Sequence, residues 1–205
     1  MGRVLDLNEC LALIRSFYPG PFPFTGSPET LTRLESERGA ILPADFRHYL
    51  QHAVPHSGHT FRAIGHPAYL YPASRLSWRM PGYNFDPILK QAIPGWKASW
   101  FLFADAGADP IIIDLNDAGE YCTVYQSLHG LGVWSFYPIA DSLGQFLLCA
   151  AALEHALTHL GQNHPVREDE QGFRLADAAA DWLFPFFERC ASKYYDDWLS
   201  VFDNA

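Results

Sequence analysis

The stretch from Trp100 to Leu115 constrains the fold more than any other part of the chain. It consists of two apolar runs separated by Asp-Ala-Gly-Ala-Asp. Residues 98–104 are almost continuously apolar, which is typical of a strand covered on both faces. Residues 110–115 begin with a proline, which a strand tolerates at its entrance. The stretch therefore predicts two consecutive strands joined by a hairpin-like turn.

Charge is distributed unevenly around this stretch. No Lys or Arg lies between Lys97 and Arg167, and the net charge is +3 over residues 1–97 but −12 over residues 98–205. An acidic folded surface suits a cationic partner. The alternative is that the charge only keeps the protein soluble. Lys and Arg are scattered rather than clustered, so we do not expect nucleic acid as a partner.

The remaining sequence predicts helices before and after the strands. Further strands are expected at 61–65, 120–127 and 134–137, with a turn at 116–119. The segment 161–173 is polar, and Pro185 should break or kink the last helical stretch. Caps and apolar periodicity predict the following helices: one capped by Asp6 and ending at Phe17, one that Ser27-Pro28-Glu29 opens and Gly39 ends, one that Leu42-Pro43-Ala44-Asp45 opens, a short one at 86–93, one from Asp141-Ser142 to about Leu160, and a final helical stretch over 175–202.

The order of these elements predicts an α+β fold. We expect a central, mainly antiparallel sheet of about four to six strands, flanked by N-terminal and C-terminal helices. A chain of 205 residues suits one domain over residues 1–205. An N-terminal helix would precede the core of this domain, and a helical extension over 161–205 would follow it.

Cysteines and apolar runs bear on the compartment. The four cysteines are far apart, so we expect small buried apolar groups, although two disulfides remain an alternative on count. The N-terminus has no signal-peptide pattern, and residues 146–153 form too short an apolar run to span a bilayer. We expect a cytoplasmic protein without membrane contact. The cysteines are Cys10, Cys122, Cys149 and Cys190.

Motifs for catalysis are weak. His48 and His52, like His155 and His159, lie four residues apart and could share a metal if a third ligand joined them. The His-Glu-x-x-His pattern is missing, as are a nucleophile elbow and phosphate loops, so surface or partly buried histidines are favoured. Asp105 and Asp109 could act as paired carboxylates, but turn capping is the simpler use. We expect no enzyme, no cofactor and no metal.

The order of short motifs resembles the SUKH superfamily of Smi/Knr-like domains over residues 28–150. The chain has Ala108 at the second small residue of the family's Gly-Gly-Asp turn. Residues 55–58 stand where the family usually has an Asn-Gly-type turn after the Leu-Pro helix. The matching motifs are Gly39-x-x-Leu42-Pro43-x-Asp45-Phe46, Phe103-Ala-Asp-Ala-Gly107-Ala-Asp-Pro-Ile, Ile113-Asp114, Val124-Tyr125, His129, and Ile139-Ala-Asp-Ser-Leu-Gly-Gln-Phe-Leu.

The resemblance implies an α+β domain that binds rather than catalyses. Bacterial members are mostly immunity proteins that neutralise polymorphic toxins, frequently nucleases, while fungal relatives resemble scaffolds in cell-wall signalling. An acidic inhibitor would cover the basic surface that a nuclease uses for its substrate. An intracellular scaffold is the alternative, and a metal-dependent enzyme built on His48 and His52 is a third hypothesis.

We therefore expect a protein partner, in the leading hypothesis a basic toxin domain. The acidic window motivates carboxylate contacts, with aromatic side chains as anchors. The oligomeric state stays open between a monomer and a homodimer formed through the C-terminal helices. The expected partner-binding residues are Asp105, Asp109, Asp117, Glu120, Tyr121 and Trp134.

Overall fold

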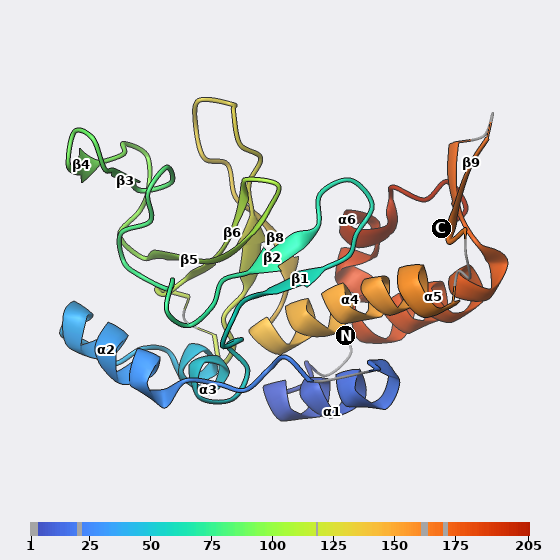
Figure 1. Cartoon of the computed structure of the whole chain (residues 1–205), viewed down its shortest axis with the longest axis horizontal. Coiled ribbons are helices and arrows are strands. Elements are labelled where there is room, and N and C mark those ends of the chain that lie inside the picture. Colours follow the sequence, from blue (N-terminus) through green and yellow to red (C-terminus); the bar gives the residue numbers. More distant parts are fainter. Residues whose placement is uncertain (1–3, 20–21, 118, 161–163, 170–171) are drawn as a thin grey trace.

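An antiparallel sheet of six strands forms the centre of the fold, in the order β1-β2-β5-β6-β7-β8 (Figure 1). The computed structural model describes residues 4–19, 22–117, 119–160, 164–169 and 172–205. The predicted α+β fold with an antiparallel sheet is confirmed. The strands of the central sheet are β1 His59–Phe61, β2 Ala68–Leu70, β5 Trp100–Ala106, β6 Asp109–Asp114, β7 Val124–Gln126 and β8 Tyr137–Ala140.

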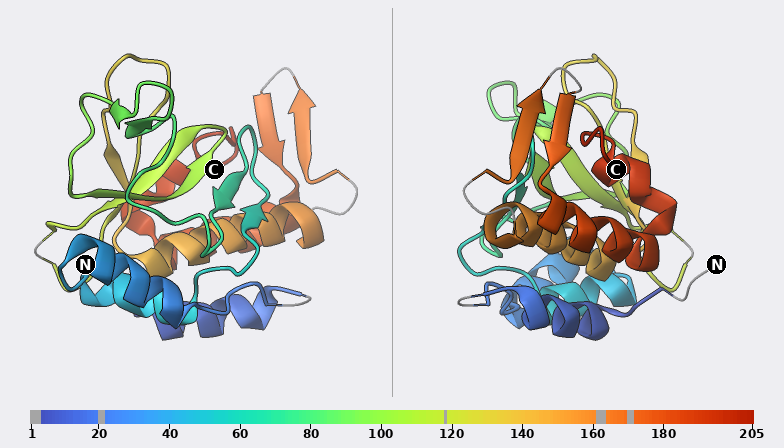
Figure 2. Two further views of the ribbon diagram at one scale, coloured as in Figure 1. Left: turned by 60° about the vertical axis from the view of Figure 1, so that its left-hand side comes forward. Right: turned by 90° about the vertical axis from the view of Figure 1, so that its right-hand side faces the viewer.

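The larger helices gather below one face of this sheet, with α4 between the sheet and α1 (Figures 1 and 2). The π-helical turn Ala156–Leu160 extends α4, and the 3-10 turn Ser192–Tyr194 precedes α6. The helices are α1 Leu7–Phe17, α2 Pro28–Arg38, α3 Ala44–His52, α4 Leu143–His155, α5 Asp177–Cys190 and α6 Tyr195–Leu199.

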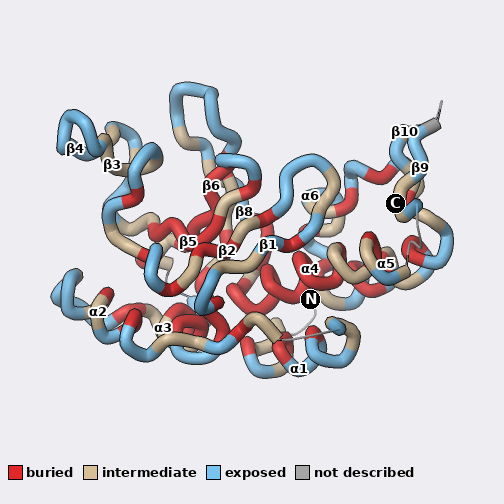
Figure 3. Tube along the Cα trace, viewed as in Figure 1, coloured by how far each residue is buried: buried red, intermediate tan, exposed pale blue. Residues whose placement is uncertain are grey.

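Helix α4 is the buried centre of the helical layer. Every residue from Leu143 to Leu153 is buried, so this helix has no solvent-facing stripe over its first three turns (Figure 3). A Cβ on Gly144 would lie 3.1 Å from the Cys10 Sγ and from the Leu7 Cα of α1. The glycine therefore permits the close approach of α1.

Strand alternation gives the sheet two unlike sides. Phe101 and Phe103 face the helices, and the Phe103 ring lies 5.6 Å from that of Phe146 in α4. Trp100, Ile112 and Tyr125 have the opposite parity in the register of β5, β6 and β7. The side that carries Phe101 and Phe103 is called the helix side. The side that carries Trp100, Ile112 and Tyr125 is called the loop side, because the chain between β2 and β5 and the chain between β7 and β8 cover it.

The predicted helix caps are confirmed. Asp6 accepts the backbone N–H of Glu9 in a capping box, and Ser27 accepts that of Thr30. Gly39 ends α2 with a φ of +69°, in the left-handed region. Ser142 caps α4 by accepting the N–H of Gln145. These signals act within three residues, which is why the sequence alone locates them.

The predicted helix at 86–93 is wrong. The segment is a small hairpin of β3 (Phe85–Asp86) and β4 (Gln91–Ala92). The Asp86 carboxylate accepts the N–H groups of Ile88 and Leu89, as a helix cap does, but Lys90 has a φ of +53° and reverses the chain. A residue in the left-handed region ends a helix, so the cap starts a turn instead.

Several predicted strands are displaced. The strand expected at 61–65 is β1, which ends at Phe61, and β2 was not predicted. The strand expected at 120–127 shortens to β7, and that expected at 134–137 lies at 137–140 as β8. Strand β6 begins at Asp109, one residue before the predicted start. Ala118, inside the predicted turn at 116–119, lies outside the described residues.

The C-terminal part differs from the prediction in two ways. Within the polar segment 161–173, part of which is not described, β9 (Val166–Asp169) pairs with β10 (Gly172–Leu175). The N–H of Phe173 donates to Asp203, a contact thirty residues away. Helix α5 continues through Pro185 and ends at Cys190, so of the break or kink expected at the proline, the break is wrong.

The cysteine prediction is confirmed, because all four are free thiols, three of them buried and Cys190 half-buried. Burial raises the pKa of the Cys10 and Cys122 thiols to about 12. Among the described residues no helix has both the length and the apolar composition needed to cross a membrane.

Candidate functional site

A cluster of aromatic rings joins the two covering loops to the loop side of the sheet. Trp96 lies 5.7 Å from Trp134 and 5.8 Å from Trp100, between ring centroids, and its indole N–H donates to the Trp100 carbonyl. Phe136 lies 4.6 Å from Trp100, and Tyr83 lies 6.2 Å from Trp134. Trp134, a predicted anchor, is half-buried in this cluster.

Apolar side chains are exposed at the tips of the same two loops. In the turn of the β3–β4 hairpin, Ile88 is 87% exposed, and in the loop between β7 and β8, Val133 is 71% exposed. Leu89 and Leu131 are also exposed. A cavity of about 360 Å³ lies between the loops, lined by Ile93, Pro94 and residues 130–134. Large exposed apolar side chains at loop tips are a feature of protein interaction surfaces.

Two carboxylates on this side are held by aromatic donors. The Trp100 indole N–H donates to Asp114 at 3.2 Å, and the Tyr125 hydroxyl donates to Asp117 at 3.2 Å. Burial, followed by the nearby Asp114 charge, raises the pKa of Asp117, while the Tyr125 hydrogen bond lowers it. Asp117 is thus placed on the loop side as a half-buried group.

Asp105 lies farther along the same side, next to two tyrosines. Burial raises the pKa of the Tyr71 hydroxyl, and the neighbouring Asp105 and Tyr83 raise it further. The Tyr71 hydroxyl is buried without a well-aligned hydrogen bond from any described residue. Asp105 also accepts the N–H of Ala108 at 3.5 Å, which is the turn capping expected from the sequence. Ala108 has a φ of +81°, a left-handed conformation at the position where the family has a small residue.

Asp109 lies at the end of the helix side and is buried. Its Oδ1 accepts the backbone N–H of His129 at 2.7 Å and lies 2.6 Å from the His129 Nδ1. These contacts anchor the loop between β7 and β8 to the start of β6. The paired-carboxylate alternative is not supported, because strand parity places Asp105 and Asp109 on opposite sides of the sheet.

Glu120 and Tyr121 belong to the connection between β6 and β7. Glu120 is exposed, and Tyr121 is half-buried. Three of the six expected residues therefore share the loop side, namely Asp105, Asp117 and Trp134, whereas Asp109 lies within the helix side. Partner contact by these six residues stays a prediction.

Asp45, which the sequence offered only as part of a motif, has a structural role. Its carboxylate is buried and accepts the N–H groups of Cys122 at 3.0 Å and Leu143 at 3.4 Å. It thereby joins the start of α3 to the β6–β7 connection and to the start of α4. Burial raises its pKa, and the two backbone hydrogen bonds oppose that shift. The partners are 77 and 98 residues away, so no local signal predicts them.

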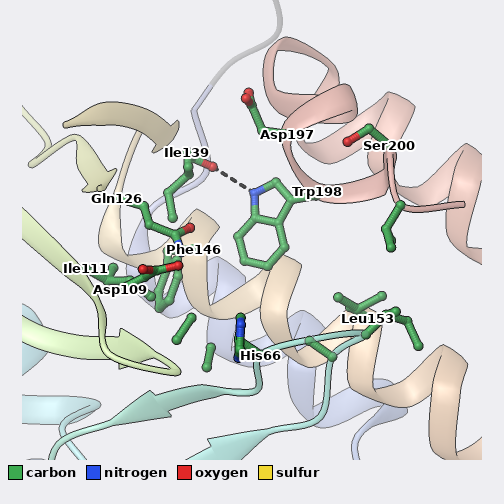
Figure 4. A pocket seen from close by; sticks show the side chains of 15 residues that line it. His66, Asp109, Ile111, Gln126, Ile139, Phe146, Leu153, Asp197, Trp198 and Ser200 are labelled. Carbon is green, nitrogen blue, oxygen red and sulfur yellow. Dashed lines mark hydrogen bonds between the residues drawn. The ribbon is translucent and has the colours of Figure 1, made fainter. Parts of the chain in front are cut away.

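A pocket of about 250 Å³ opens beside Asp109, at the end of the helix side of the sheet (Figure 4). The Trp198 indole N–H donates to the Ile139 carbonyl at 2.8 Å and fixes one wall. Gly107, next to the lining residue Ala106, leaves room for the lining residue His66, because a Cβ on Gly107 would overlap the His66 imidazole. The lining residues are Ala63, Ile64, His66, Ala68, Ala106, Asp109, Ile111, Gln126, Ile139, Phe146, Leu153, Asp197, Trp198, Ser200 and Val201.

Neither histidine pair is joined by a third metal ligand among the described residues. The His48 and His52 rings lie 4.7 Å apart at 84°, and the His155 and His159 rings lie 5.4 Å apart. Within the described part of the chain, no group of three His, Cys, Asp or Glu side chains is arranged to hold a metal ion.

The model of the SMI1 / KNR4 family (SUKH-1) matches residues 25–149, more than half of the chain. The protein belongs to the SUKH-1 family. The resemblance read from the short motifs over 28–150 is thereby confirmed. No curated protein matches the chain closely enough to count as a relative.

The SUKH-1 segment includes the whole central sheet and the first half of α4, whereas α5 and α6 follow it. Asp109, Gln126 and Phe146 in the pocket come from the SUKH-1 segment, and Asp197 and Trp198 come from the following α6. The pocket is thus formed jointly by the family domain and the C-terminal helices.

Proposed function

We propose that this SUKH-1 protein is an immunity protein, which binds and neutralises a cognate toxin without catalysis. The supporting observation is the loop side of the sheet, where the covering loops have exposed apolar tips and the sheet with its β6–β7 connection carries the carboxylates of Asp105, Asp114 and Asp117. Apolar tips supply a desolvated contact, and carboxylates select a basic partner and speed association. A nuclease toxin has the required basic surface. The family is generally non-catalytic, which agrees with a binding role.

The first test is capture of the partner. The tagged full chain would be used at low salt to capture proteins from host lysate, and bound proteins would be identified by mass spectrometry. We expect a basic toxin domain that elutes as salt rises. Co-expression of the chain should then rescue cells from that domain. Capture of a signalling protein without rescue would contradict the immunity role and favour the scaffold.

The second test uses matched variants of the β6–β7 connection, which carries Asp117 of the loop side and the exposed Glu120. Asp117→Asn with Glu120→Gln should slow association several-fold at low salt and have little effect at high salt. Asp181→Asn with Glu188→Gln removes the same charge from exposed positions on α5 and should leave the rate unchanged. Equal effects of the two pairs would mean that net charge alone matters and that this surface is not the contact.

A further inference from the structure

The pocket beside Asp109 combines an apolar interior with a charged group. Its interior includes Ile111, Phe146 and Trp198. The Asp109 side chain is only 10% exposed, and Figure 4 shows its carboxylate directed from β6 toward the space beside Trp198. His129 uses Oδ1, and no hydrogen bond from the described residues reaches Oδ2. Oδ2 is not among the fully buried polar atoms, so it stays accessible and can accept N–H donors from a group that enters the pocket.

The surroundings of the pocket add negative charge. Asp197 lies on the α6 side of the opening, and Gln126 offers a carbonyl oxygen within it. Burial raises the pKa of Tyr137 first, and the charges of Asp109 and then Asp197 raise it further, so both carboxylates act on the same region. In the part of the chain that the structure describes, no Lys or Arg lines the pocket.

The volume of the pocket limits the size of the cation that it can hold. A volume of about 250 Å³ lies below the roughly 300–1,000 Å³ typical of small-molecule sites, and it suits one long side chain. Arginine carries an apolar stem and a planar head with several N–H donors, which matches an apolar wall and more than one acceptor. We infer that this pocket receives an arginine side chain presented by the protein partner.

This inference rests on the proposed function for the existence of a partner, but the selectivity of the pocket is measurable without one. The probe is n-butylguanidinium, titrated into the full chain while the indole N–H signal of Trp198 is followed by NMR. The signal is assigned with Trp198→Phe. n-Butylurea has nearly the same shape without charge, and n-butylammonium represents lysine. We expect butylguanidinium to bind at least tenfold more tightly than butylurea and more tightly than butylammonium.

Three variants locate the effect. Asp109→Asn should weaken butylguanidinium binding about tenfold, and Asp197→Asn, at an exposed position that tolerates change, should weaken it about threefold. Asp181→Asn on α5 is the control and should have no effect. Equal binding of butylurea and butylguanidinium, preference for butylammonium, or insensitivity to both pocket variants would overturn the inference.

The captured partner separates this inference from the proposed function. If Asp197→Asn weakens binding of both the probe and the toxin domain, the arginine site is supported. If it weakens binding of the probe alone, the pocket is not the partner's contact, and the inference fails while the immunity role stands. Failure to capture any toxin contradicts the proposed function, whatever the probe shows.

Discussion

The two sides of the central sheet both carry aromatic residues, but these residues pack against different kinds of structure. On the helix side, Phe101 and Phe103 pack against helices whose own surfaces are buried around α4. On the loop side, Trp100 and Trp134 pack against loops whose tips leave Ile88 and Val133 exposed. Apolar side chains stabilise a fold in proportion to the surface that folding removes from water. The exposed apolar tips therefore contribute little to stability. The difference indicates that most of the helix side holds the fold together. Surface left for binding lies on the loop side and in the pocket beside Asp109, at the end of the helix side.

The largest expected effect comes from opening the helix side. Phe103→Ala should lower the free energy of unfolding by about 3–5 kcal/mol, because Phe103 is fully buried between Tyr49 and Phe146. Trp134→Ala on the loop side should cost clearly less, since Trp134 is half-buried. Urea denaturation of both variants measures the difference. A larger cost for Trp134→Ala would reverse the comparison.

Removing the Asp45 carboxylate should be the next largest loss. Asp45→Ala leaves two buried N–H groups without an acceptor and should cost about 3 kcal/mol. Asp45→Asn keeps one acceptor oxygen and should cost less. Chemical denaturation at pH 7 compares the two variants, and equal losses would argue against the hydrogen bonds as the cause.

The pH dependence of Asp45→Asn has a defined sign. Burial raises the pKa of Asp45 in the folded state above its unfolded value, so the folded state holds this proton more tightly. The contribution of the group to stability is therefore greatest below about pH 4 and falls as pH rises through the folded-state pKa. The neutral Asn lacks this dependence. The cost of Asp45→Asn should thus be greater near pH 4 than at pH 7, and a cost that grows with pH would contradict the assignment.

A smaller loss of stability is expected from a substitution in the turn between β5 and β6. Gly107→Ala places a methyl group against His66 at a φ of +61° and should cost about 2 kcal/mol. Gly130→Ala is the matched control, because its φ is +79° but no atom lies within 4 Å of the added Cβ. Thermal unfolding should show a smaller loss for Gly130→Ala, and equal losses would mean that His66 moves away freely.

The smallest effect on stability is expected at the loop tips. Leu131→Ser with Val133→Ser should change the free energy of unfolding by less than about 0.5 kcal/mol per site, because both side chains are already exposed. The same pair should accelerate dissociation of the captured toxin domain, measured by surface plasmon resonance. Loss of stability with unchanged dissociation would assign these tips to the fold and not to binding.

The sequence by itself determined the local parts of this protein. The caps at Asp6, Ser27 and Ser142 act within three residues, and Gly39 needs only its own backbone freedom. The two apolar runs from Trp100 to Leu115 predicted the central strands, because a strand covered on both faces needs apolar residues at both parities. The order of the motifs predicted the SUKH family.

Only the tertiary structure decided which groups meet across the chain. Asp105 and Asp109 looked alike in the sequence, yet strand parity separates them, and His129, twenty residues away, pairs with Asp109. The hairpin of β9 and β10 is held by a contact to Asp203, thirty residues away. The pocket likewise needs α6 to close over a strand almost ninety residues earlier. Such contacts depend on the packing of distant elements, whereas propensity and periodicity report only on neighbours within a few residues.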